Sequence, residues 1–202
     1  MNEILIYDFI GAGLFEDGVT AKAVKSQLEK MQGDVLVRIN SPGGDVFDGF
    51  AIHNLLLQHP GEITVRVDAL AASAASVIAM AGDHVEMADN ALMMIHNPWT
   101  FSLGDADEMV KTAERLEKVK SSILESYLRR SNMDRDEISL AMDEETWLSA
   151  AEAIDAGFAD ALVGESDSAL NLAAPWIRNA PKVPERKPPE YRLAARARFP
   201  LL

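Results

Sequence analysis

A serine and a histidine in the middle of the chain have the side chains that acyl transfer requires. Ser73 lies among the small residues 69–76, between an extended run and an apolar helical segment that ends at Gly82. A serine at the start of a helix has unpaired backbone N–H groups beside it, and the helix dipole favours negative charge there. His96, at the end of a second short apolar run, can take the proton of a serine hydroxyl. The pattern predicts a serine nucleophile with a histidine base.

The turn Ser41-Pro42-Gly43-Gly44 offers backbone donors for the same chemistry. An oxyanion hole needs amides aimed at the charge that develops on the substrate carbonyl, and one such donor contributes about 2.7–4 kcal/mol. Glycine suits this place because no side chain blocks the approach. We expect the amides of Gly44 and Ala74 to be these donors. An ordinary type II turn also favours a Pro-Gly pair, and both interpretations can hold together.

Each of these residues also has a simpler interpretation. Ser73 and Ser76 are small residues of the kind that close helix packing needs, and we assign Ser76 to packing. A lone histidine after an apolar run, such as His96, is commonly a core or loop residue. The remaining histidines match no catalytic pattern: His53, His59 and His84.

Strands and helices alternate through the first eighty residues, which favours stacked βαβ units and a parallel sheet. The expected strands are at 3–9, 35–39 and 63–69, with helices at 19–31 and 45–59 between them. In open α/β sheets, sites lie at the carboxyl ends of strands, where the glycine turn and Ser73 both fall. Further expected elements are a long helix at 105–130, helices at 135–142 and 149–157, and a closing strand at 158–163.

Four short motifs follow one another in a fixed order: Asn40-Ser41-Pro42-Gly43-Gly44, Ala71-Ala72-Ser73, Ala81-Gly82 and Met94-Ile95-His96-Asn97-Pro98. On these motifs the chain resembles, over about residues 4–163, the proteolytic subunit of Clp protease. In particular it resembles the phage and prophage Clp-like peptidases that act in capsid maturation.

The resemblance implies an α/β fold of the Clp protease/crotonase-like type, with stacked βαβ units and a projecting long helix. It implies a serine endopeptidase with Ser73 as nucleophile and His96 as base, which needs no cofactor and forms a homo-oligomeric ring. The substrates would be proteins or peptides, such as phage capsid or scaffold proteins. In the family the long helix interlocks two stacked rings, whereas the pattern alone also allows it to pack on its own sheet.

The acidic member of the triad departs from the family pattern. The family's aspartate precedes an aromatic-Leu-Ser-Ala run, which here is Trp147-Leu148-Ser149-Ala150. The matching position is Glu145, whose longer side chain changes the geometry. The family's degradative members also carry an N-terminal segment that meets an ATP-driven unfoldase, while this chain begins at its first strand. We therefore expect an ATP-independent peptidase.

The composition excludes several other classes of protein. The 202 residues include no cysteine, and the four histidines lie in no metal-binding spacing, so we expect no metal site. No apolar run reaches membrane-spanning length and no signal pattern opens the chain, so we expect a cytoplasmic protein of a bacterial host or of a phage procapsid. The net charge of −13 argues against nucleic acid as a partner.

The sequence divides near residue 164. We expect residues 1–164 to form the peptidase domain and residues 165–202 to form a mobile, basic extension, since five prolines between 175 and 189 oppose regular structure. Three other functions remain open: a subunit of an ATP-dependent Clp-type machine, a crotonase-type acyl-CoA enzyme and a noncatalytic scaffold. The crotonase alternative would leave the pair of Ser73 and His96 without a purpose.

Overall fold

The computed structural model describes residues 2–12 and 18–164. The elements in chain order are β1 (Asn2–Tyr7), α1 (Ala21–Leu28), β2 (Val35–Ser41), α2 (Val46–Gln58), β3 (Ile63–Ala72), α3 (Ala74–Ala79), β4 (His84–Met87), β5 (Leu92–Ile95), α4 (Ala106–Leu128), α5 (Arg135–Asp143), β6 (Thr146–Ser149), α6 (Ala150–Asp155) and β7 (Ala161–Leu162). The expected basic extension at 165–202 lies outside the described residues.

The strands form one mostly parallel sheet in the order β1-β2-β3-β4-β7. The long strand β3 also pairs, over its last three residues, with β5 in parallel, and β5 carries the antiparallel β6. Strand β3 therefore connects two parts of the sheet: its first half pairs with β4, and its end pairs with β5. This branching brings the ends of β3 and β5 to one place.

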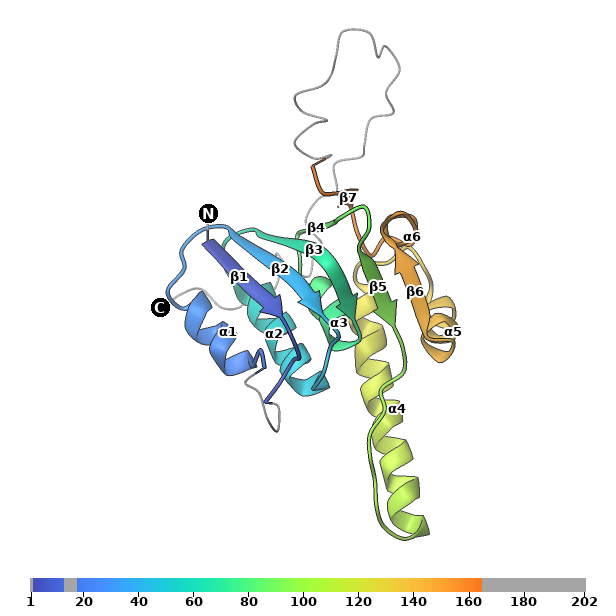
Figure 1. Cartoon of the computed structure of the whole chain (residues 1–202). Helices are drawn as coiled ribbons and strands as arrows, with labels where there is room; N and C mark the ends of the chain where they lie inside the picture. The colour runs from blue at the N-terminus through green and yellow to red at the C-terminus, as the bar shows by residue number, and fades with distance from the viewer. Residues whose placement is uncertain (1, 13–17, 165–202) are drawn as a thin grey trace, which may run out of the picture.

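Helices α1, α2 and α3 cover one face of the sheet (Figure 1). Alternate residues of the central strands point to that face and are completely buried, among them Ile4, Val37 and Val65. Period-two burial of branched apolar side chains against helices is the expected core of a βαβ sheet. The predicted α/β architecture is confirmed.

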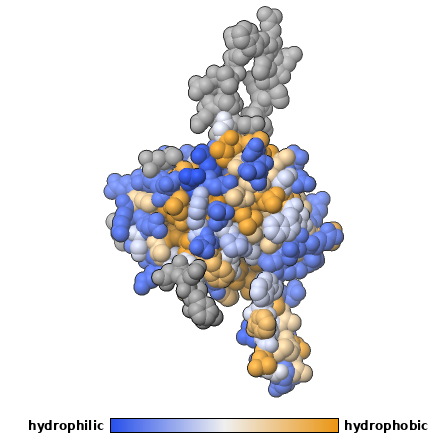
Figure 2. Space-filling model, viewed as in Figure 1, coloured by the Kyte–Doolittle hydropathy of each residue, from blue (hydrophilic) through white to orange (hydrophobic). Residues whose placement is uncertain are grey.

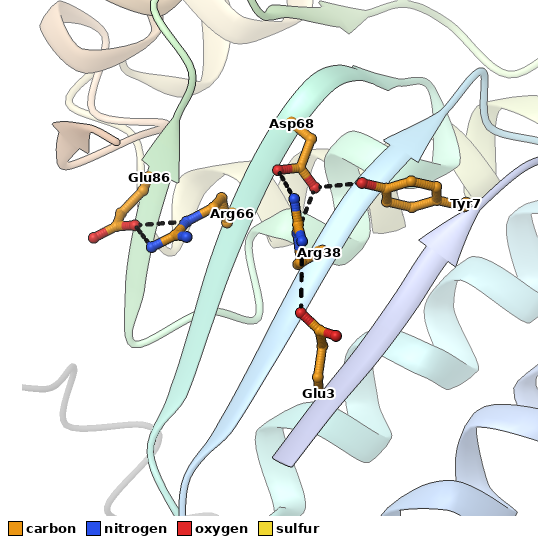
Figure 3. A network of polar contacts seen from close by, with 6 residues as sticks. All are labelled: Glu3, Tyr7, Arg38, Arg66, Asp68 and Glu86. Carbon is orange, nitrogen blue, oxygen red and sulfur yellow. Dashed lines mark hydrogen bonds and ion pairs between the residues drawn. The ribbon is translucent and has the colours of Figure 1, made fainter. Parts of the chain in front are cut away.

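The opposite face of the sheet is polar, and its charges are paired across neighbouring strands (Figure 3). Arg38 of β2 donates two hydrogen bonds to Asp68 of β3, at 2.8 and 2.9 Å, and the Tyr7 hydroxyl donates a third at 2.7 Å. Arg66 pairs in the same way with Glu86 of β4 at 2.8 Å. Pairing within the chain lets this face remain polar without burying an uncompensated charge.

Helix α4 leaves the body of the protein and projects from it, with the segment that follows β5 running beside it (Figure 1). Its C-terminal end is anchored, because Ile123, Leu124 and Tyr127 are buried. Its N-terminal half is exposed, and apolar side chains lie on the projection (Figure 2). The exposed apolar residues there are Trp99, Phe101, Leu103, Met109 and Val110. The helix does not pack along its own sheet, and the predicted projection is confirmed.

Most expected elements are found, with shifted ends, but one was not predicted. Strand β6 occupies residues 146–149, where the sequence indicated a loop leading to a helix at 149. The strand exists because it pairs with β5, a partner about fifty residues earlier in the chain. At the other end, the strand expected at 158–163 is reduced to Ala161–Leu162. Among the described residues, no helix is both long enough and apolar enough to cross a membrane.

Candidate active site

Ser73 occupies a sharp turn between β3 and α3. Its backbone has φ 56° and ψ −123°, in the positive-φ region that non-glycine residues rarely adopt. The turn is held on both sides: the Ser73 amide donates to the Met94 carbonyl at 2.9 Å, and its carbonyl accepts from the Ser76 hydroxyl at 2.6 Å. Backbone strain of this kind persists where the surroundings enforce it, and it is concentrated at functional sites.

The imidazole of His96 lies directly on the Ser73 hydroxyl. Nε2 of His96 is 2.8 Å from Oγ of Ser73, which is within hydrogen-bond distance. The contact follows from the sheet, because β3 and β5 are parallel neighbours and both residues come just after their carboxyl ends. In the tautomer that carries its proton on Nδ1, His96 accepts the serine proton at Nε2. The two residues that the sequence proposed as a pair are thus in contact.

Burial keeps His96 suited to act as a base. The pKa of His96 is lowered, chiefly because burial disfavours the charged imidazolium, while the negative charge of Glu145 acts in the opposite direction. A histidine with a lowered pKa is neutral at physiological pH, and the neutral ring has the free lone pair that proton abstraction needs.

Glu145 lies on the other side of the imidazole. Its Oε2 atom is 4.0 Å from Nδ1 of His96, a distance longer than a hydrogen bond, and its side chain is 58% exposed. Glu145 has φ 51° in the tight turn before β6, and the pairing of Thr146 with Ile95 fixes that turn beside His96. The indole of Trp147 donates to the other carboxylate oxygen at 3.3 Å.

The neighbouring carboxylate, Asp143, is directed elsewhere. It accepts hydrogen bonds from Lys120 of α4 and from the Asn97 amide, the latter at 2.7 Å. The hydrogen bond from Lys120 is the main reason why the pKa of Asp143 is lowered. Asp143 therefore ties α5 to the base of the projection, and Glu145 is the carboxylate placed toward His96.

The glycine turn packs against the nucleophile. A Cβ atom on Gly43 would lie 2.7 Å from Cβ of Ser73 and 2.6 Å from the Ala72 carbonyl oxygen, so only glycine fits. The Gly43 amide donates to the Ser41 hydroxyl at 3.1 Å. Within the described residues, the amides of Gly44 and Ala74 form no hydrogen bond, and both residues line the same cleft as Ser73. These are the two amides that the sequence proposed for an oxyanion hole.

The cleft around these groups has a volume of about 930 Å³. It extends from the glycine turn and α3 along the inner side of the projection. Its lining is largely apolar, and includes Phe47, Val77, Met94, Trp99, Phe101, Leu116, Val119 and Ile123. A cleft of this size and character accepts a polypeptide segment with apolar side chains.

The other side chains that could take part in catalysis or metal binding lie outside the cleft or have structural roles. His59 bonds to the Gly33 carbonyl at 2.8 Å, and His84 pairs with Asp160, both outside the cleft. No group of three or more histidine, aspartate or glutamate side chains within residues 2–12 and 18–164 is arranged to hold a metal ion. Sequence reasoning missed Tyr127, whose hydroxyl lies 2.9 Å from Oγ of Ser76 and anchors α4 against α3. No local signal marks such a contact, since it joins residues far apart in the chain.

Comparison with known proteins identifies the family of this chain. The sequence model of the family described as Clp protease matches residues 4–166. An ATP-dependent Clp protease proteolytic subunit of Bacteroides thetaiotaomicron is 26% identical over 166 residues, which cover 79% of this chain and 76% of that protein.

Two further relatives carry similar names. Subunit 1 of the ATP-dependent Clp protease of Chlamydia pneumoniae is 30% identical over 161 residues, with 74% of this chain and 84% of that protein covered. Subunit 3 of Rhodococcus jostii is 31% identical over 148 residues, with coverage of 71% and 73%. The α/β fold, with its mostly parallel sheet, is consistent with this family. The chain therefore belongs to the Clp protease family of serine endopeptidases.

Proposed function

We propose that Ser73, His96 and Glu145 are the catalytic residues of this chain and that it hydrolyses internal peptide bonds. The observation that carries the proposal is the 2.8 Å contact between Ser73 Oγ and His96 Nε2, at the end of two parallel strands and inside the cleft. Glu145 is the positioning residue behind His96. The amides of Gly44 and Ala74 form the oxyanion hole.

The reaction follows from these positions. Oγ of Ser73 attacks the scissile carbonyl carbon while its proton passes to Nε2 of His96. The carbonyl oxygen becomes an alkoxide, which accepts hydrogen bonds from the amides of Gly44 and Ala74. Collapse of the tetrahedral intermediate breaks the C–N bond, and His96 returns the proton to the leaving amine. Water then repeats the sequence on the acyl-enzyme, releasing the new carboxylate and restoring Ser73.

The projecting helix supports an oligomeric enzyme. Phe101 and Leu103 are 96% and 100% exposed on the projection, and an apolar surface of this kind on a folded protein marks a contact with another molecule. We propose that copies of this chain meet through α4 and the preceding segment in a ring-shaped assembly. For the wild type, light scattering should give the mass of an assembly of several copies of the chain. The Leu103→Asp variant should give a smaller assembly mass. A monomeric wild-type protein would contradict this part of the proposal.

For the substrate and its location, we propose that the chain cleaves phage or prophage head proteins without an ATPase, in a bacterial cytoplasm or a procapsid. It rests on the sequence resemblance to the phage branch of the family. Residues 1–164 would form the peptidase domain and residues 165–202 an extension. The second candidate is a subunit of an ATP-dependent degradation machine, and the names of the three relatives favour it.

Cleavage of quenched fluorescent peptides tests the function, and cleavage of a folded protein separates the two candidates. The wild type should cleave peptides with apolar residues, and Ser73→Ala should reduce the rate to background while the circular dichroism spectrum stays unchanged. An ATP-independent enzyme keeps the same rates when ATP and a Clp-type unfoldase are added. A subunit of a degradation machine instead digests a folded substrate only with both present. Equal peptide cleavage by wild type and Ser73→Ala would refute the proposed nucleophile.

A further inference from the structure

Two buried hydroxyl groups meet directly behind the nucleophile turn. Ser76 of α3 is completely buried, Tyr127 at the anchored end of α4 is 1% exposed, and their hydroxyl oxygens lie 2.9 Å apart. The neighbours of Ser76 on α3, Ala75 and Val77, are apolar and buried. Polar groups in such a place cost free energy unless each is hydrogen-bonded. Alanine and phenylalanine would fill the same space without that requirement, so the two hydroxyls indicate a role beyond packing.

The single hydrogen on each hydroxyl fixes the direction of their bonds. Ser76 donates its hydrogen to the Ser73 carbonyl oxygen at 2.6 Å. The Oγ atom of Ser76 therefore accepts from Tyr127, which is the donor of that pair. Burial raises the pKa of Tyr127, so the phenol keeps the proton that it donates. A chain of hydrogen bonds thus runs from α4 through α3 to the Ser73 carbonyl.

The Ser73 carbonyl shares its peptide group with the Ala74 amide, one of the two proposed oxyanion donors. The described residues contain no cis peptide bond, so the C=O and N–H of this group point in opposite directions. The same carbonyl accepts from the amides of Ser76 and Val77, at 3.0 and 3.3 Å. With the Ser76 hydroxyl, three donors on one side hold the peptide plane and thereby aim the Ala74 N–H on the other side.

The second proposed oxyanion amide is held in the same manner. The Gly44 N–H shares its peptide group with the Gly43 carbonyl, which accepts from the Ile10 amide at 2.9 Å. That donor belongs to the backbone. At Ala74 the additional donor is a side chain, which a substitution can remove.

We propose that Ser76 and Tyr127 are positioning residues for the oxyanion hole, a proposal that rests on the peptidase function above. Their hydroxyls hold the peptide group between Ser73 and Ala74 so that the Ala74 amide meets the developing alkoxide. An oxyanion hole stabilises the transition state because its donors are fixed before the reaction. The turn has to be held in place, since Ser73 has a φ of 56° and such strain persists only where the surroundings enforce it. Both hydroxyls act through the backbone, because their hydrogen bonds join them to each other and to the Ser73 carbonyl.

Three variants separate positioning from packing: Tyr127→Phe, Ser76→Ala and the double variant. Tyr127→Phe keeps the ring and its edge contact with Phe158, whose ring centroid is 5.5 Å away. The double variant leaves neither hydroxyl without its partner, so its Tm should stay close to that of wild type. The control is Ser126→Ala, which removes a buried hydroxyl next to Tyr127 that donates to the Ser122 carbonyl at 3.4 Å.

Kinetics with a quenched fluorescent peptide should show a loss in kcat at unchanged KM. The expected loss is about tenfold in Ser76→Ala and about three- to fivefold in Tyr127→Phe, which is less than the cost of removing an oxyanion donor because the Ala74 amide remains but is less well fixed. The double variant should lose no more than Ser76→Ala, because the two hydroxyls act in one chain. Ser126→Ala should keep the wild-type kcat.

A peptide aldehyde labelled with ¹³C at its carbonyl gives a readout that partial unfolding does not move. Oγ of Ser73 bonds to the aldehyde carbon, His96 takes the hydroxyl proton, and the aldehyde oxygen becomes an alkoxide in the place of the reaction's oxyanion. The pKa of that oxygen, measured from the ¹³C chemical shift against pH, reports how well the oxyanion is stabilised. In the double variant this pKa should be higher than in wild type, by about one pH unit for a tenfold loss in kcat.

Wild-type values of kcat and of the adduct pKa in Ser76→Ala and Tyr127→Phe would overturn the positioning role while leaving the peptidase intact. Losses of kcat that only follow the loss in Tm, and that Ser126→Ala shares, would overturn it as well. Absence of both peptide cleavage and adduct formation in wild type would instead refute the proposed function, and this role with it.

Discussion

Replacing Glu145 by glutamine should slow peptide cleavage moderately, because the carboxylate acts on His96 through space. Its Oε2 atom is 4.0 Å from Nδ1, and the side chain is 58% exposed. Two unit charges at that distance interact by about 1 kcal/mol in water and by about 4 kcal/mol at an effective dielectric constant of 20. Exposure places Glu145 toward the lower value, and about 1–2 kcal/mol corresponds to a loss of about five- to thirtyfold in kcat.

The same variant should change the pH profile in a definite direction. His96 acts as a base only when neutral, so kcat/KM falls as the pH drops through its pKa. Glu145 raises that pKa against the effect of burial, and removing its charge lowers the pKa further. The acid limb of the profile should therefore move to lower pH in Glu145→Gln. A purely structural defect would lower the rate without moving the limb.

Kinetics of the peptide substrate between pH 5 and 9 provide the assay, with Glu144→Gln as the control. That variant removes the same charge one residue earlier, from an exposed side chain. Equal rate losses in the two variants with no shift of the acid limb would refute the role of Glu145. A large loss in Asp143→Asn with none in Glu145→Gln would show that Asp143 turns to His96 in the working enzyme.

Two further predictions concern the glycine turn and the far edge of the sheet. Gly43→Ala should reduce kcat/KM by at least about a hundredfold, because the new Cβ would meet Ser73 at 2.7 Å, whereas Gly33→Ala, also at positive φ but with open space around it, should retain activity. The pKa of His84 is raised, chiefly by its hydrogen bond to Asp160, so its stabilising effect is present below the unfolded pKa of about 6.5 and is lost as the pH rises through the raised value. The Tm of wild type should thus exceed that of His84→Gln by about 2 °C at pH 6, and the difference should shrink by pH 8. The same difference in Tm at pH 6 and pH 8 would contradict an ion pair between His84 and Asp160.

The sequence predicted those parts of the fold that depend on local pattern. The helix expected at 45–59 is found as α2, and Asp45 caps it with its carboxylate on the amides of Phe47 and Asp48. The long helix expected at 105–130 and the strands expected at 35–39 and 63–69 were also found, because burial on one face imposes a period on the sequence. The pairing of β5 with β6 has no such period, since it joins short segments about fifty residues apart.

The site shows the same division. Ser73 and His96 were identified from their types, their small neighbours and their motifs, and the structure brings them within 2.8 Å. The relation of Glu145 to His96 depends on the turn before β6, so neither the distance between them nor the exposure of Glu145 could be predicted from the residues alone.

Labelling by a fluorophosphonate probe tests most directly that Ser73 is an activated nucleophile. The reagent bonds covalently to a serine oxygen whose proton a neighbouring base can accept, and mass spectrometry locates the modified residue. Wild type should be modified at Ser73 alone, Ser76→Ala should still be modified there, and labelling should fail in Ser73→Ala and become much slower in His96→Ala. Labelling at another serine, or labelling of Ser73 at the same rate without His96, would contradict the account.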